Sequence, residues 1–122
     1  MSACPGAAAI TVRAGQAIKT TVTWMNTGSQ AYSFDIIVIM GDYDPSTGNV
    51  TNAYIIGKAL DQASSPGQSV TTAMTSPSIP TGLVRATPYD LIVAICDWDD
   101  VNNKFINIYT ACFSTDIITI TS

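Results

Sequence analysis

The chain has 122 residues, of which only 11% are charged, well below the roughly 25% of an average globular protein. Its net charge is −4 and its five basic residues are scattered, which argues against nucleic acid or an anionic membrane as a partner. No apolar run approaches the roughly 20 residues of a membrane span. The first residues lack the features of a signal peptide. The length predicts a single domain, residues 1–122.

β-Branched residues are abundant and strong helix formers are scarce, which predicts an all-β fold. Residues 1–13 are expected to form either an N-terminal arm or a first strand. Further strands are predicted, in chain order, at 16–26, 31–41, 50–60, 69–76, 89–98, 105–113 and 116–122. An irregular crossover is expected between the fourth and fifth of these strands, and no internal repeat is expected. Seven to eight short strands with turns about every ten residues favour an immunoglobulin-like Greek-key β-sandwich.

The predicted strand at 31–41 is apolar on both faces, although a strand with one solvated face should alternate apolar and polar residues. Its outward face carries two isoleucines. In an immunoglobulin-like sandwich the strand at 89–98 is the direct neighbour, and its outward residues enlarge this apolar patch. An exposed patch of several hundred Å² usually marks an interface. The predicted interface residues are Ile37, Ile39, Ile92, Ala94 and Trp98.

Two alternatives account for this patch. In the first, the chain covers it with residues 50–60 or with the segment after Asp100. In the second, another protein covers it. At about 25 cal/mol per Å², burying 400 Å² is worth on the order of 10 kcal/mol before the costs of association.

The three cysteines leave an odd count. Counting outward from the hairpin turn near residues 101–103 places Cys96 opposite Ile108, which leaves Cys112 about four residues, or ~13 Å, out of register. That separation is too large for a Cys96–Cys112 disulfide. Buried free thiols are therefore expected, and a Cys4–Cys112 bridge is the alternative if the N-terminal arm lies alongside.

The sequence contains no histidine, which excludes Ser-His and Cys-His catalysis and histidine-based metal sites. Paired carboxylates are the remaining catalytic possibility. The acidic residues at 42–44 and those at 97–100 end neighbouring antiparallel strands, so they should lie at opposite ends of the sandwich. No acid–base pair is therefore expected, and the chain is predicted to be neither an enzyme nor a cofactor-binding protein.

The acidic turn "DWDDVNN" is the best candidate for a calcium site, because carboxylate and amide oxygens are the ligands that calcium prefers. The alternative is that aspartate and asparagine are ordinary turn residues here. The turn "DYDPSTGN" is a weaker candidate of the same kind. The calcium candidates are Asp97, Asp99, Asp100 and Asn102.

Three stretches, "AGQAIKTTVTWMNTGSQAYSFDIIVIM", "SSPGQSVTTAMTSPSIP" and "TPYDLIVAICDWD", resemble the CARDB group (cell-adhesion-related domains found in bacteria) and similar bacterial or phage immunoglobulin-like modules. The resemblance covers roughly residues 14–122, with a longer segment than usual after Asp100. It implies a seven-stranded sandwich in an extracellular, adhesive or structural setting, with no catalytic residues.

The resulting functional hypothesis is a non-enzymatic structural module that acts through protein–protein contacts. Its most specific form is a virion surface subunit, such as a capsid decoration or cement protein, whose partner is either a copy of itself or a capsid or lattice protein. One alternative is a cell-surface adhesion module or extracellular filament subunit of a microbe. A second alternative is a calcium-assisted carbohydrate-binding module.

Overall fold

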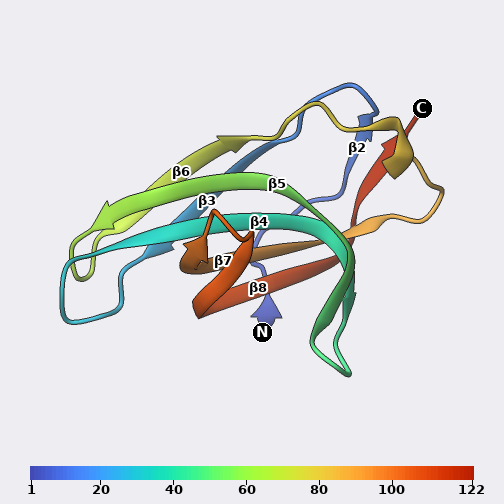
Figure 1. Cartoon of the computed structure of the whole chain (residues 1–122). Coiled ribbons are helices and arrows are strands. Elements are labelled where there is room, and N and C mark those ends of the chain that lie inside the picture. The colour runs from blue at the N-terminus through green and yellow to red at the C-terminus, as the bar shows by residue number, and fades with distance from the viewer.

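The computed structural model describes all 122 residues as two β-sheets packed face to face (Figure 1). The larger sheet has the strand order β1-β8-β7-β4-β5, with β2 also paired to β8, and the smaller sheet pairs β3 with β6. The strands are β1 (Ser2–Ala3), β2 (Ile10–Arg13), β3 (Lys19–Met25), β4 (Tyr32–Asp44), β5 (Asn49–Ser64), β6 (Ser69–Thr75), β7 (Tyr89–Asp99) and β8 (Lys104–Thr121). A short 3₁₀ turn, η1 (Thr81–Leu83), lies in the predicted crossover. The predicted all-β sandwich architecture is confirmed.

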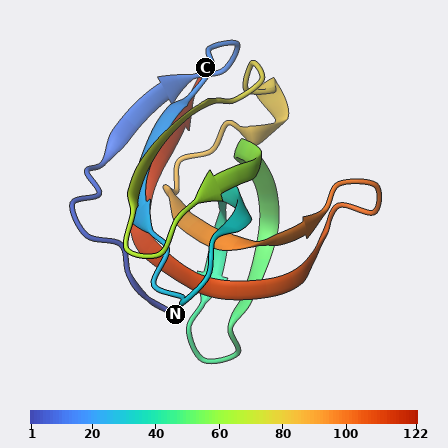
Figure 2. The same cartoon turned by 90° about the vertical axis from the view of Figure 1, so that its left-hand side faces the viewer.

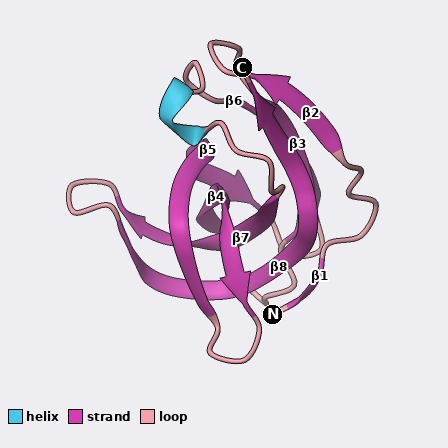
Figure 3. Ribbon diagram, turned by 90° about the vertical axis from the view of Figure 1, so that its right-hand side faces the viewer, coloured by secondary structure: helices cyan, strands magenta, loops and turns pink.

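The main difference from the predicted strands is the length of the outer ones, β5 and β8. Two strands predicted at 105–113 and 116–122 are one strand, β8, with an irregular register around Asp116. Asp116 has a φ of 54°, and Asp61 in β5 has a φ of 53°. Such bulges bend a strand and increase its twist without ending its pairing. The two strands therefore continue as long, bent ribbons around the sheet (Figures 2 and 3).

The main hydrophobic core lies between the two sheets and follows the predicted alternation. It contains Trp24, Ile36, Val38 and Met40, all 7% exposed or less. The Trp24 indole meets the Phe34 ring edge to face, with ring centroids 5.7 Å apart. Its N–H donates a hydrogen bond of 3.1 Å to the Thr72 hydroxyl, so the one polar atom of this large side chain is satisfied.

The N-terminal segment pairs in parallel with β8, through β1 at Cys112 and Phe113 and through β2 at Ile118 to Thr121. It is covalently attached there by a Cys4–Cys112 disulfide, whereas Cys96 is a buried free thiol. The expectation of three free thiols is therefore wrong, and the alternative bridge is present. The counting argument was sound, because Cys96 does lie opposite Ile108. Counting residues from the hairpin turn predicts only the β7–β8 register, and it does not predict that the N-terminal arm pairs in parallel with β8.

The chain is an internal duplication, contrary to the sequence prediction. Residues 33–44, "SFDIIVIMGDYD", match residues 88–99, "PYDLIVAICDWD", and residues 15–22, "GQAIKTTV", match residues 67–74, "GQSVTTAM". The structure shows the same repeat: strands β3, β4 and β5 correspond in order to strands β6, β7 and β8. Aligned valines, Val38 and Val93, face each other in the central β4–β7 pair, and aligned Thr21 and Ala73 face each other in the β3–β6 pair. A pseudo-two-fold axis through both sheets explains both coincidences.

Two aspartates at equivalent positions of the repeat hold the bulged strands to the centre of the sheet. Asp35 of β4 accepts backbone N–H bonds from Asp61 of β5 (2.9 Å) and Trp98 of β7 (2.8 Å). Asp90 of β7 accepts the equivalent bonds from Asp116 of β8 (2.9 Å) and Tyr43 of β4 (2.8 Å). Each carboxylate thus satisfies N–H groups that the irregular ladder leaves free.

Candidate functional site

The predicted interface residues do not form an exposed surface. Their exposed fractions are 0% for Ile37, 8% for Ile39, 3% for Ile92, 1% for Ala94 and 9% for Trp98. Together with Cys96 they form a second hydrophobic cluster on the face of the larger sheet opposite the main core. Of the two alternatives for this patch, the structure shows the first, in which the chain covers it.

Aromatic pairs at the two ends of the sheet provide this cover. The Tyr43 and Phe113 rings lie 4.6 Å apart although β7 separates their strands, and the Trp98 and Phe105 rings lie 4.9 Å apart. Val50, in the β4–β5 hairpin, folds back so closely over Gly41 that an added Cβ there would lie 2.9 Å from the valine side chain. The bent hairpins thus enclose the second cluster. Residues of both predicted covering segments, 50–60 and the part after Asp100, take part.

The four calcium candidates do not converge on one point. Asp97 binds the Tyr32 and Tyr109 hydroxyls, whereas Asp99 accepts hydrogen bonds from the turn residues Val101 and Asn102. Asp100 pairs with Lys58 at 2.6 Å. No group of three acidic, cysteine or histidine side chains is arranged to hold a metal ion. The turn-residue interpretation therefore describes Asp99 and Asn102.

In the weaker candidate turn, Asp44 accepts hydrogen bonds from the Ser46 N–H and hydroxyl, while Asp42 binds Arg85. The Arg85 guanidinium also lies 3.6 Å from the centroid of the Tyr89 ring. The hydrogen bonds that Arg85 donates to Asp42, with a further one from Asn52, lower the pKa of Asp42 to about 2. The acidic residues at 42–44 and 97–100 lie at opposite ends of the antiparallel β4–β7 pair, as predicted.

We expect the Asp42–Arg85 pair to stabilise the fold only above acidic pH. Because the folded-state pKa of Asp42 is depressed from 3.8, its contribution is complete above about pH 5 and is lost as the pH falls towards 2. The Asp42 side chain is 38% exposed, so screening reduces the contribution to about 1 kcal/mol. Asp42→Asn should lower the free energy of unfolding in urea by that amount at pH 7 and by almost nothing at pH 2. Asp61→Asn, whose side chain makes no hydrogen bond, is the control; a loss that persists unchanged at pH 2 would contradict the assignment.

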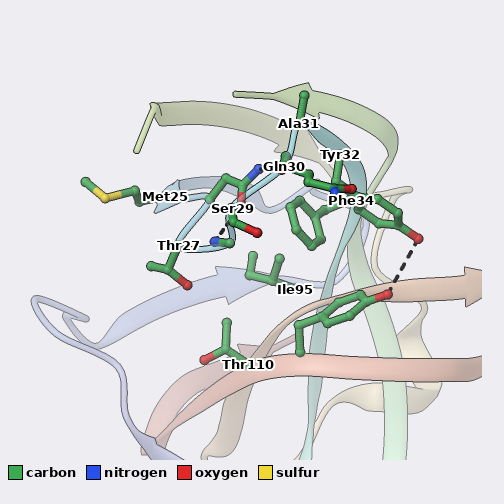
Figure 4. Close-up of a pocket in the computed structure, with 12 residues that line it drawn as sticks. Met25, Thr27, Ser29, Gln30, Ala31, Tyr32, Phe34, Ile95 and Thr110 are labelled. Atoms are coloured by element: carbon green, nitrogen blue, oxygen red, sulfur yellow. Dashed lines mark hydrogen bonds between the residues drawn. The ribbon is translucent and has the colours of Figure 1, made fainter. Parts of the chain in front are cut away.

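One pocket of about 460 Å³ combines aromatic and polar side chains between the two sheets (Figure 4). Three rings, those of Tyr32, Phe34 and Tyr109, lie edge to face with centroids 4.8–6.0 Å apart. Figure 4 shows Ile95 and Thr110 along one side and the 25–31 segment along the other. Burial raises the pKa of Asp97, which binds the two tyrosine hydroxyls. Hydrogen bonds from Tyr109, Tyr32 and Asn107 lower this pKa by more, so the net shift is downward. The same carboxylate raises the pKa of the Tyr109 hydroxyl.

Four exposed apolar side chains lie on the β7–β8 hairpin, and one of them, Tyr109, also borders the aromatic pocket. We call this set the β8 edge surface; it consists of Val101, Ile106, Ile108 and Tyr109, which are 90%, 62%, 53% and 52% exposed. β1 and β2 pair with β8 only beyond residue 111, so the part of β8 that carries these side chains has one unpaired edge. A hollow next to it is lined by Met1, Ile108 and Tyr109.

The sequence predicts that the apolar run "FINIY" enlarges the patch on the strand at 89–98, with either Ile106 and Ile108 or Phe105 and Tyr109. It did not predict that this run lies on an unpaired sheet edge, and it did not predict the aromatic pocket. The sequence carries no sign of the pocket, because Tyr32 and Tyr109 are 77 residues apart; in the structure their hydroxyls lie 3.5 Å apart and both bind the Asp97 carboxylate.

No family model matches the chain, and neither the curated proteins nor the solved structures contain a significant match. No helix in the structure has the length and apolar character needed to cross a membrane.

Proposed function

We propose that the chain is a non-enzymatic structural module that assembles through protein–protein contacts, with the β8 edge surface as the contact. The observation that carries the proposal is this set of large apolar side chains, 52–90% exposed, three of them on a stretch of β8 with an unpaired edge and Val101 in the adjoining turn. Apolar residues scattered singly over a surface are normal, but a cluster on one open edge favours pairing with another chain. The partner is a second copy or a capsid or lattice protein.

The most specific form of the proposal is a virion surface subunit, with a microbial cell-surface module as its rival. The Cys4–Cys112 disulfide supports either setting, because disulfides persist on virion and cell surfaces and are rare in reducing compartments. The finer fold assignment, an immunoglobulin-like Greek-key sandwich of the CARDB type, belongs to the same proposal. It is supported by the strand order β8-β7-β4-β5 opposite β3-β6.

Sedimentation velocity over a concentration series tests the proposal. The wild-type chain should form dimers or larger species, and the double variant Ile106→Lys/Ile108→Lys should remain monomeric with an unchanged circular dichroism spectrum. Ile10→Lys, at a residue 40% exposed on β2, is the matched control and should associate like the wild type. A wild-type chain that stays monomeric up to about 1 mM would count against self-assembly, since even weak specific contacts form near that concentration.

Carbohydrate binding is a second candidate, favoured by the aromatic pocket. Ligand sites typically combine aromatic walls with a few convergent polar groups, and this pocket offers three rings beside the polar 26–30 segment. Because the acidic side chains do not form a metal cluster, binding would not depend on calcium. Titration with oligosaccharides in EDTA, followed by NMR signals of residues 26–32, tests it; Phe34→Leu should abolish any shift.

A further inference from the structure

The internal symmetry exposes a difference between the two outer strands of the larger sheet. β5 and β8 are equivalent in the duplication, yet they are covered unequally. β8 carries β1 and β2 along its outer edge, whereas β5 pairs only with β4 (Figure 3). None of the backbone hydrogen bonds outside the sheet ladders involves residues 53–58 of β5. The outward backbone groups of this stretch therefore have no partner in the chain.

The site of β1 on β8 has a direct counterpart on β5. β1 pairs with Cys112 and Phe113, and the Cys4 N–H donates a 2.9 Å bond to the Phe113 carbonyl. A shift of 55 positions, the shift that relates Asp35 to Asp90, takes these two residues to Gly57 and Lys58. The smaller sheet leads to the same location. Thr23 and Met25 border the groove around β1, and the repeat of the smaller sheet, which matches Gly15 with Gly67, relates them to Thr75 and Pro77.

A groove is present at this counterpart position. It has a volume of about 560 Å³ and is lined by Ala53, Ile55, Lys58, Thr75, Pro77 and Asn103. The Lys58 ammonium is paired with Asp100 at 2.6 Å, so the lining offers no free charge to a ligand. The groove therefore suits an extended segment with small, uncharged side chains, like the Ser2–Ala3 segment of β1 that pairs with β8.

We propose that the β5 groove is a strand-acceptor site, which binds an extended, uncharged segment of another polypeptide in parallel with residues 56–59, centred on Gly57 and Lys58. The structure contains the template for this complex in Ser2 to Pro5 on β8. The carbonyl of Lys58 takes the place of the Phe113 carbonyl as acceptor, and the bound strand completes the sheet edge. The position equivalent to Cys112 is Gly57, so no disulfide forms and binding is reversible.

The experiment uses the oxidised full chain, labelled with ¹⁵N, and a peptide of residues 1–9 carrying Cys4→Ala. The disulfide keeps the chain's own arm on β8, so the peptide meets only the β5 groove. We expect the peptide to shift the amide signals of residues 56–59 and to slow hydrogen exchange of the Lys58 N–H by about tenfold or more at saturation.

Two variants at exposed β6 positions test the location. Thr75→Arg fills the groove and should weaken binding about tenfold or more, whereas Thr71→Arg, on the same strand but outside the groove, should leave it unchanged. Absence of shifts at residues 56–59 with about 5 mM peptide, shifts confined to other residues, or equal weakening by both variants would overturn the inference. The site rests on the internal symmetry and not on the β8 edge surface, so the peptide titration and the sedimentation test can fail independently.

Discussion

Replacing Cys4 and Cys112 by serine should lower the free energy of unfolding by about 4 kcal/mol, the largest effect that we expect from any surface-directed change. The bridge joins residues 108 positions apart, so it closes almost the whole chain into a loop and removes much of the conformational freedom of the unfolded state. It also anchors β1, whose paired residues are only Ser2 and Ala3. Chemical denaturation followed by tryptophan fluorescence measures the loss.

Cys96→Ala is the matched control for this prediction, because it removes the third cysteine without touching the bridge. The Cys96 thiol is fully buried and burial raises its pKa to about 12, so it stays protonated and inert. Its replacement leaves only a small cavity, at a cost of about 1 kcal/mol. Adding a reductant to this variant should then reproduce the loss seen in the serine variant. A loss of about 1 kcal/mol or less in the serine variant would show that strand pairing alone holds the arm.

Asp35→Ala and Asp90→Ala should each lower the free energy of unfolding by about 3 kcal/mol, and by similar amounts. Each carboxylate accepts two backbone N–H bonds from bulged strands on its two sides. Removing it leaves two backbone donors without a protein partner, of which those of Trp98, Tyr43 and Asp116 are partly buried. The similarity of the two effects follows from the pseudo-two-fold axis, which gives the two carboxylates equivalent hydrogen-bond partners.

Urea denaturation of the two variants tests this prediction, with Asp44→Ala as the control. Asp44 also accepts two hydrogen bonds, but it does so in an exposed turn, so its loss should be far smaller. Hydrogen exchange adds a local readout: Asp35→Ala should expose the amides of Asp61 and Trp98, and Asp90→Ala those of Tyr43 and Asp116. A large effect from only one of the two variants would contradict the equivalence of the halves.

The internal duplication was visible in the sequence and was nevertheless missed. Asp35 and Asp90 begin matching stretches, but the motifs around them vary between Phe and Tyr, Ile and Leu, or Tyr and Trp. Such changes preserve the apolar character of a strand, so each stretch looks like an ordinary buried strand. The structural role of the two aspartates is visible only in the folded chain, where each carboxylate accepts backbone N–H bonds from the irregular strands on its two sides.

The calcium candidates illustrate a second property that the sequence does not determine. Spacing along the chain places oxygen atoms near one another, but it does not say which partners they choose. Asp97 turns to Tyr32 and Tyr109, and Asp100 turns to Lys58, which comes from the strand at the far margin of the same sheet. Those partners are between 12 and 65 positions away in sequence.

The all-β class, the alternation of the main core and the position of Cys96 opposite Ile108 follow from the order of residues along each strand. These properties are local, because successive side chains of a strand point to opposite faces. The cover of Ile37 and Ile39, the partner of Cys4 and the set of exposed apolar residues depend instead on contacts between strands far apart in sequence. The physical reason is the bending of the sheet at its bulges, which brings Tyr43 to Phe113 across an intervening strand.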